Sequence, residues 1–392
     1  MDNHQPLQRR ALLKLAGMTT LASTSGSLAA LGHTTAAPAA SRKKTVVTIF
    51  QRFGMDGLLA VCPYSDERLA ALRPNLMLSH PGSGHADARL ELGGGFGLHP
   101  AFAPLAPFYS DGRLAIVHGV GSPDNTRSHS EAQRWWESGA PGDRSQRDGW
   151  LNRSLAALAP SGQALPAVAL THERPRIFYG DQPVTVADDI ARLSLPADAG
   201  FRARLRRLYE AHEDPALQSA ARQALTLSSV LTDEAKPKTP YPEGSALGAS
   251  LRDIAHLIKA DLGLRLAFTE SRESPNGRGT WDTHSNAAET EADGPFPQMA
   301  GDLAASLAAF MEDLGPHQDD VIVVTLTDFG RNVVENERQG ADHGRATAMF
   351  VFGGGVRGGH VYGTLPERFE RDALEDAMDL PVATDYRSVL AP

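Results

Sequence analysis

The chain has 392 residues, of which 41% are hydrophobic, with 37 glycines and 26 prolines. This composition supports a substantial hydrophobic core and excludes intrinsic disorder as the overall state. Acidic residues outnumber basic ones, 47 to 38, and no basic stretch is interleaved with aromatic side chains, so nucleic acid is not an expected partner. The single cysteine, Cys62, allows no intrachain disulfide, and a zinc site would have to use histidine and carboxylate ligands.

Residues 1–40 carry the pattern of an export signal. Arg9 and Arg10 precede a leucine-rich and alanine-rich stretch, and TTAAPAA then offers a site for a signal peptidase. A transmembrane or amphipathic helix is the alternative, but the apolar run is only moderately hydrophobic and contains Lys14. The pattern predicts a twin-arginine signal, the twin-arginine translocase as a partner during export, and a periplasmic or secreted protein without a stable membrane anchor.

The remaining residues, 45–392, are predicted to form a single α/β domain. In chain order, strands are expected in TVVTIFQ, RLAIVHGVG, PAVAL, DQPVTVADD, LRLAFTES, DDVIVVTLT and TAMFVFGGG. Helices are expected in residues 99–112, in the segment that carries Trp135 and Trp136, and in residues 201–231, 245–263 and 298–315. Because strands alternate with helices, the expected fold is a mostly parallel central sheet flanked by helices on both faces.

Four segments place acidic, hydroxyl or imidazole side chains at predicted strand ends or turns. They are FGMDG with Asp56, DNTRSHS with Thr126, Ser128 and His129, TWDTH with Asp282 and His284, and TLTDFG with Asp328 together with GADHG, which holds Asp342 and His343. Loops at the carboxyl edge of a parallel sheet lie close together, so these residues can converge. Clustered carboxylates become favourable around a divalent cation, and a set of Asp and His without Cys favours zinc or manganese over calcium or magnesium.

Each of these segments also has a purely structural interpretation. An aspartate in a glycine turn, such as Asp56, is typical of turn formers, and Thr126 or Ser128 can cap the following helix. Asp-Thr-His at 282–284 is a weak motif when taken alone. Histidines 99, 118, 172, 256, 317 and 360 are interpreted as structural or surface residues.

Longer stretches resemble a known bacterial family. Residues 47–64, 98–139, 281–286 and 325–363 are similar to a twin-arginine-exported family catalogued as a domain of unknown function, numbered 1501. That family resembles a branch of the alkaline phosphatase and sulfatase superfamily. The resemblance covers nearly all of the chain after the signal, and it implies an alkaline phosphatase-like α/β fold with one or two bound metal ions.

The resemblance also implies roles for individual residues. Asp56, Asp282, His284, Asp328 and His343 match metal-binding positions, with Asp342 orienting His343. Asp282 and His284 are separated by one residue, where relatives place three, and Phe329 stands where many relatives have His or Asn. Thr126 is the favoured nucleophile, with Ser128 as the second choice and a water molecule left open.

These roles imply an exported metal-dependent hydrolase of phosphate or sulfate esters, with a small-molecule or polysaccharide anionic ester as substrate. A hydroxyl at a helix N-terminus gains from the helix dipole and from a nearby metal, while Arg127 and Arg331 are expected to hold the ester oxygens. The alternative is a catalytically silent protein of this fold that binds glycans or envelope components, which Phe329 favours.

Overall fold

The computed structural model describes residues 44–158, 163–193, 198–230, 237, 239–287 and 294–390. The predicted twin-arginine signal, residues 1–40, lies outside these residues. Within the described part of the chain, no helix combines the length and apolar character needed to cross a membrane.

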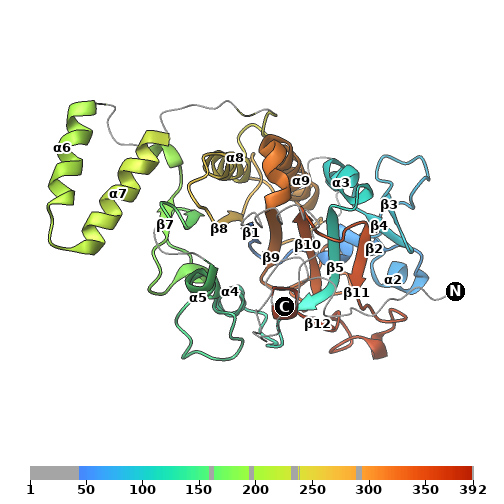
Figure 1. Ribbon diagram of the computed structural model, residues 1–392. Coiled ribbons are helices and arrows are strands. Elements are labelled where there is room, and N and C mark those ends of the chain that lie inside the picture. Colours follow the sequence, from blue (N-terminus) through green and yellow to red (C-terminus); the bar gives the residue numbers. More distant parts are fainter. Residues whose placement is uncertain are drawn as a thin grey trace, which may run out of the picture.

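A nine-stranded sheet forms the centre of the described structure (Figure 1), in the order β11-β5-β10-β9-β1-β8-β6-β7, with β12 beside β5. The strands are β1 Thr45–Gln51, β5 Leu114–Gly121, β6 Ala167–Leu170, β7 Thr185–Ala187, β8 Leu266–Ser271, β9 Val321–Thr327, β10 Thr347–Gly353, β11 His360–Gly363 and β12 Thr384–Asp385. Among these strands, β10 runs antiparallel to both of its neighbours and all other pairs are parallel. The predicted mostly parallel α/β sheet is confirmed.

Helices cover both faces of this sheet (Figure 1). On one face, Ile49 of β1 belongs to a cluster with Ile254 of α8 (Ala246–Lys259) and Leu303 of α9 (Pro295–Leu314). On the other face, Phe50 belongs to a cluster with Trp136 of α4 (His129–Ser138), together with α5 (Trp150–Leu158) and α10 (Tyr386–Leu390). Neighbouring residues of one strand thus bury against opposite layers, and each full burial of a large apolar side chain contributes about 1.5–3 kcal/mol.

Smaller elements surround this core. A three-stranded antiparallel sheet joins β2 (Val61–Pro63), β4 (Phe96–Leu98) and β3 (Leu90–Gly93). Beside it lie the short helices α1 (Gly57–Ala60), α2 (Glu67–Leu72) and α3 (Ala106–Ser110). The 3₁₀ helices are η2 Pro100–Leu105, η3 Arg176–Phe178, η4 Ile190–Leu193, η5 Gly315–Asp320 and η6 Arg371–Ala373.

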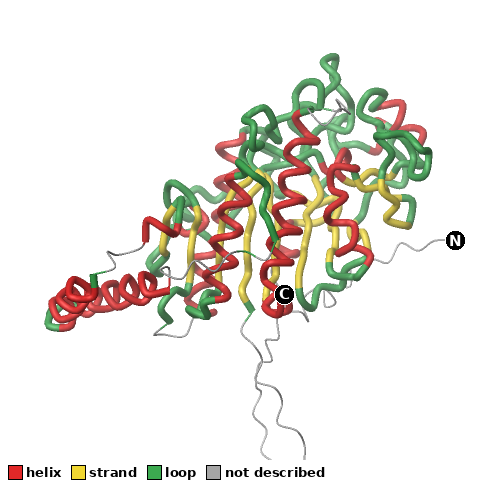
Figure 2. The backbone as a smooth tube through the Cα atoms, turned by 90° about the horizontal axis from the view of Figure 1, so that it is seen from above, coloured by secondary structure: helices red, strands yellow, loops and turns green. Residues whose placement is uncertain are grey.

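Two predicted helices are interrupted. Residues 99–112 form η2 followed by α3, because Pro104 and Pro107 lack the N–H that a continuous α-helix needs. Residues 201–231 form two helices, α6 (Ala199–Glu210) and α7 (Pro215–Val230), because Pro215 starts a new helix more readily than it continues one. The two helices form a hairpin that projects from the β7 end of the sheet (Figures 1 and 2).

The strand register brings several strand ends to one edge of the sheet. Gln51, the last residue of β1, pairs with Thr327 of β9 and Ser271 of β8. Because β10 runs in the opposite direction, its first residue, Thr347, pairs with Val120 near the end of β5. The loops after β1, β5, β8 and β9 and the loop before β10 therefore emerge at the same edge.

Candidate metal centre

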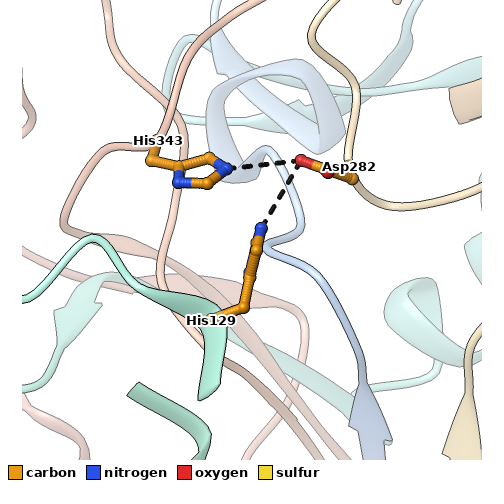
Figure 3. Close-up of side chains that lie close together, drawn as sticks. All are labelled: His129, Asp282 and His343. Carbon is orange, nitrogen blue, oxygen red and sulfur yellow. Dashed lines mark ion pairs between the residues drawn. The ribbon is translucent and has the colours of Figure 1, made fainter. Parts of the chain in front are cut away.

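Three histidines and one aspartate point at one another at this edge. The Nε2 atoms of His129, His284 and His343 lie 3.6, 3.1 and 3.5 Å from the same oxygen, Asp282 Oδ1. His284 Nε2 and His343 Nε2 are 2.9 Å apart. Figure 3 shows the rings of His129 and His343 directed at Asp282 from separate segments. Within the described residues, His129, Asp282 and His343 form a group that could hold a metal ion, with one ligand atom of each within 4.8 Å of the others.

His129 is held from behind by a buried carboxylate. It is the first residue of α4, and its Nδ1 lies 2.7 Å from Asp328 Oδ2, directly after β9. Gln133, one turn along α4, donates to the same oxygen at 2.9 Å, and the backbone N–H of Phe53 donates to both oxygens at 3.3 Å. Asp328 therefore fixes the ring so that its Nε2 faces Asp282.

The other two imidazoles are held in the same way. His284 Nδ1 lies 2.8 Å from Asp342 Oδ1, and His343 Nδ1 lies 2.8 Å from the backbone oxygen of Arg127. Metal-binding histidines in proteins usually donate their second ring nitrogen to a carboxylate or a backbone carbonyl in this manner. The arrangement around all three rings is the one expected of metal ligands.

The proton positions leave the Nε2 atoms of the three rings without a hydrogen-bond donor between them. A carboxylate and a carbonyl oxygen only accept hydrogen bonds, so Nδ1 of each ring carries a proton. In the neutral rings the Nε2 atoms of His284 and His343 then turn lone pairs toward each other at 2.9 Å. His129 Nε2 is buried, and among the described residues it has no hydrogen-bond partner. Additional protons or a metal ion at this point would satisfy these atoms, and the donor set suits zinc.

The local charges also suit a divalent cation. Asp282, Asp328 and Asp342 bring three carboxylates, and the guanidinium of Arg331, 2.5 Å from Asp282 Oδ1, compensates one of them. With neutral histidines two negative charges are left, which one divalent ion balances.

The pKa values of two groups reflect this charge distribution. Burial lowers the pKa of His129, but the nearby carboxylates of Asp282 and Asp328 outweigh it and raise the pKa to about 9. Burial raises the pKa of Asp282, yet the nearby His129, His343 and Arg331 bring it far below the usual range. The carboxylate is therefore ionised, and a proton occupies His129 at neutral pH unless a metal ion replaces it.

Arg331 fixes Asp282 rather than facing solvent. Its side chain is fully buried, and it donates to the backbone oxygens of Phe53, Gly54, Trp281 and Ala341 as well as to Asp282. These bonds tie the loops after β1, β8 and β9 together. The ester-holding role predicted for Arg331 stays a prediction, and its observed contacts serve to position Asp282.

Aromatic rings line one side of the site. Phe329 is 4% exposed and stacks on His129, with ring centroids 4.7 Å apart, and it also contacts His343. The rings of Phe53 and His129 lie nearly perpendicular, with centroids 5.6 Å apart. Where a ligand was expected from the resemblance, Phe329 instead restricts the rotation of two imidazoles.

Asp56 lies in a different environment. It caps α1 by accepting from the N–H groups of Leu58 and Leu59, and Arg73 Nη2 lies 2.8 Å from its Oδ2. The Asp56 side chain is 1% exposed, and the group of metal-capable residues found in the described chain does not include it. The predicted metal-binding role of Asp56 stays untested, and its contacts are those of a structural residue.

The predicted nucleophiles lie in the segment before α4. Thr126 Oγ1 donates to Glu131 Oε2 at 3.3 Å, and Ser128 Oγ lies 3.2 Å from Ser130 Oγ. Arg127, between them, pairs with Asp376 and Asp379. The segment adjoins the candidate metal centre through His129 and through the carbonyl of Arg127.

Sequence reasoning named His129 in its segment but did not assign it as a ligand. The available signal was its place in the first turn of a helix that follows a strand end, next to two candidate nucleophiles. Asp328, predicted as a ligand, contacts Nδ1 of His129, the ring nitrogen that faces away from Asp282. Asp342 was expected to orient His343, but it contacts the ring of His284 instead.

The fold and the site define a mostly parallel α/β protein with a histidine-rich centre at the carboxyl edge of its sheet. Residues 100–390 match the family model described as "Protein of unknown function (DUF1501)", so the chain belongs to this family. No curated protein matches the chain.

The chain is also similar, at low identity, to several solved structures. They include the C-terminal periplasmic domain of EptC from Escherichia coli in complex with Zn, at 9% identity and TM-score 0.37, covering 81% of this chain and 74% of that one. A protein in the alkaline phosphatase superfamily from Vibrio parahaemolyticus has 10% identity and TM-score 0.37, covering 90% and 71%. The PsFucS1 sulfatase from Pseudoalteromonas sp. has 14% identity and TM-score 0.36, covering 82% and 64%. Similarity this distant says nothing about the chemistry of the site.

Proposed function

We propose that this protein is a metal-dependent hydrolase of phosphate or sulfate esters. The observation that carries the proposal is the convergence of three imidazole Nε2 atoms on Asp282, each ring held at Nδ1 by a carboxylate or a carbonyl. His129, Asp282, His284 and His343 would hold the ion. When bound, a divalent metal ion, with zinc or manganese favoured, supplies Lewis acidity toward an ester oxygen and an attacking hydroxyl.

Helix α4 favours an anionic substrate beside the metal centre. The helix begins at His129, and the side chain of its N-cap residue, Ser128, does not cap the backbone N–H groups of the first turn. The positive end of the helix dipole and the N–H groups of the first turn can therefore interact with ester oxygens.

Thr126 is the favoured nucleophile in this proposal, and Ser128 is the second choice. Thr126 Oγ1 already donates to the carboxylate of Glu131, which is a suitable acceptor for its proton. Ser128 Oγ is bonded to another hydroxyl, Ser130 Oγ, and lacks such an acceptor in the contacts described. A hydroxyl that attacks the phosphorus or sulfur atom would form a covalent ester and break the bond to the substrate's alcohol, which leaves with a proton. A water molecule would then hydrolyse the covalent ester, releasing phosphate or sulfate and restoring the hydroxyl.

Elemental analysis of purified protein is the first test. We expect one or more equivalents of a divalent metal in the wild type and in the control His85→Ala, which changes an exposed histidine elsewhere, and clearly less in His284→Ala. A folded wild type that contains no metal and takes none up would overturn the hydrolase proposal.

Turnover is tested with p-nitrophenyl phosphate and p-nitrophenyl sulfate. We expect Thr126→Ala to lower the rate by roughly 10³-fold or more while leaving the metal content unchanged. If the wild type binds metal but hydrolyses neither ester, the catalytically silent glycan-binding or envelope-binding protein becomes the better proposal. Loss of activity in Ser128→Ala instead would reassign the nucleophile.

We also propose that the twin-arginine translocase exports this protein to the periplasm or beyond. Arg9 and Arg10 support this, since twin-arginine signals depend on this pair. Replacing both by lysine should leave the protein in the cytoplasm, as cell fractionation would show. Continued export of that variant would contradict the proposal.

A further inference from the structure

The loop between η6 and β12 reaches the segment that carries the predicted nucleophiles. Arg127 Nη2 lies 3.0 Å from Asp376 Oδ2 and also pairs with Asp379. The Asp379 side chain is fully buried, whereas that of Asp376 is 65% exposed. A buried carboxylate needs its partner far more than an exposed one does, so the tie to Asp379 is the one that holds Arg127 in place.

Arg127 is itself part of the support of the metal centre. Its backbone oxygen is the acceptor 2.8 Å from His343 Nδ1, and this contact orients the ring toward Asp282. Thr126 and Ser128 are its neighbours in the chain. Any shift of Arg127 therefore moves both candidate nucleophiles and releases one imidazole.

The loop that carries Asp379 is anchored next to the same site. The N–H of Val333, two residues after Arg331, donates to Met378 O at 2.8 Å, and the N–H of Ala346, three residues after His343, donates to Leu380 O at 3.2 Å. Both apolar side chains, Val333 and Ala346, share a buried cluster with Leu380. The position of Asp379 is thus fixed on both sides by segments that adjoin the metal centre.

We infer that Asp379 is a positioning residue for this centre: through Arg127 it holds His343 and the hydroxyl-bearing segment 126–128 in place. The arginine then serves as a tether and does not hold the ester oxygens. This inference rests on the proposed metal centre, but the contacts that carry it belong to the protein alone. Residues that orient a metal-binding histidine typically change metal affinity by about 10–100-fold when removed.

Zinc titration against a competing chelator tests the inference with two matched variants. Each variant removes the charge of one of the two aspartates that pair with Arg127. Asp379→Asn should weaken zinc binding by about 10–100-fold, whereas Asp376→Asn, which removes the exposed partner of the same guanidinium, should change it by less than about fivefold. Equal effects of the two variants would overturn the inference. Should Asp379→Asn not fold, Arg127→Gln breaks the tie from its more exposed end and should give the same loss.

A third comparison, made in a His343→Ala background, distinguishes a loss of His343 positioning from a general loss of structure. If Asp379 acts through His343, then Asp379→Asn should cause no further loss of zinc affinity in a His343→Ala protein. An undiminished effect in that background would show that Asp379 acts elsewhere and would overturn the inference.

The ring of His343 gives a readout that needs no metal. Long-range proton–nitrogen NMR spectra of metal-free protein report which ring nitrogen carries the proton, and His343→Ala identifies the signal. We expect Nδ1 of His343 to carry a proton in the wild type and in Asp376→Asn, because it donates to the backbone oxygen of Arg127, and to carry it only part of the time in Asp379→Asn. An unchanged His343 signal in Asp379→Asn would overturn the tether, whereas absent zinc binding in the wild type with the expected NMR result would overturn only the metal centre.

Discussion

The loops after β1 and β8 carry aspartates, Asp56 and Asp282, that the sequence treats alike, yet their environments differ. Asp56 is 1% exposed, caps a helix and is neutralised by Arg73, a buried arginine from the end of α2. Asp282 is 36% exposed and faces three imidazoles, with one arginine behind it. An aspartate in such a loop has a structural role when an arginine and backbone N–H groups fully compensate its charge. It is a candidate metal ligand when the lone pairs of imidazole nitrogens face it.

The largest expected effect is on stability, from Asp56→Ala. The substitution leaves the buried guanidinium of Arg73 without its carboxylate and removes the cap of α1, so we expect a loss of about 3–5 kcal/mol in the free energy of unfolding. Denaturant unfolding monitored by circular dichroism measures it. If the variant keeps its stability but loses metal, Asp56 is a ligand after all and the contrast between the two aspartates fails.

Low pH should lower the free energy of unfolding because it favours protonation of His118, which lies near Asp56. Burial lowers the pKa of His118 to about 4, despite its hydrogen bond at 2.9 Å to the backbone oxygen of Val61 and the nearby charge of Asp56. The unfolded chain binds a proton near pH 6.5 and the folded chain does not, so this contribution is present above pH 6.5 and is lost as the pH falls toward 4. It amounts to roughly 3 kcal/mol.

The change is measured as the free energy of unfolding of metal-free protein between pH 7.5 and 4.5. His118→Gln, which keeps a donor and an acceptor but cannot titrate, should show a flatter pH dependence than the wild type. Identical pH profiles for the two proteins would rule out this role of His118.

Asp282→Asn should have the opposite signature to Asp56→Ala. Arg331 keeps its four backbone acceptors in this variant, so the free energy of unfolding should fall by only about 1 kcal/mol. Loss of a charged ligand should weaken metal binding by about 100-fold or more. Isothermal titration with zinc measures this, and unchanged affinity would remove Asp282 from the proposed ligand set.

The smallest expected effect on zinc affinity comes from the carboxylates that contact the Nδ1 atoms of His129 and His284, and it differs between the two. Asp342 is 57% exposed, whereas the Asp328 side chain is fully buried. Water can replace Asp342 as the acceptor from His284, so Asp342→Asn should weaken zinc binding by less than about tenfold, and Asp328→Asn by about 10–100-fold. A larger loss in Asp342→Asn would indicate that this carboxylate binds the metal directly.

Much of the fold follows from local patterns. The β-branched and apolar runs at 45–51 and 321–327 predict buried parallel strands, and both lie at the centre of the sheet. The reversed direction of β10 is not visible in its sequence, since an apolar strand reads the same in either orientation. That reversal matters for the site because it brings His343 to the edge where the other strands end.

The candidate site was predicted less completely than the fold. Asp282, His284 and His343 were predicted as ligands and lie close together, whereas His129 was not predicted and Asp56 lies in another environment. The ring contacts that distinguish candidate ligands from the residues that orient them join residues far apart in the chain, such as His129 with Asp328 and His343 with Arg127. Residue type and spacing carry no record of these pairs.

The sequence by itself determined the α/β class, the segments that supply the site and the absence of thiolate ligands, because hydrophobic periodicity and composition are local properties. Which aspartate pairs with which arginine was decided by the tertiary structure alone. Arg73 neutralises Asp56, Arg331 fixes Asp282, and Asp379 ties down Arg127, each across a distance in the chain that no local pattern spans. The physical reason is that charge compensation and the orientation of a ring depend on the final packing of loops at one edge of the sheet.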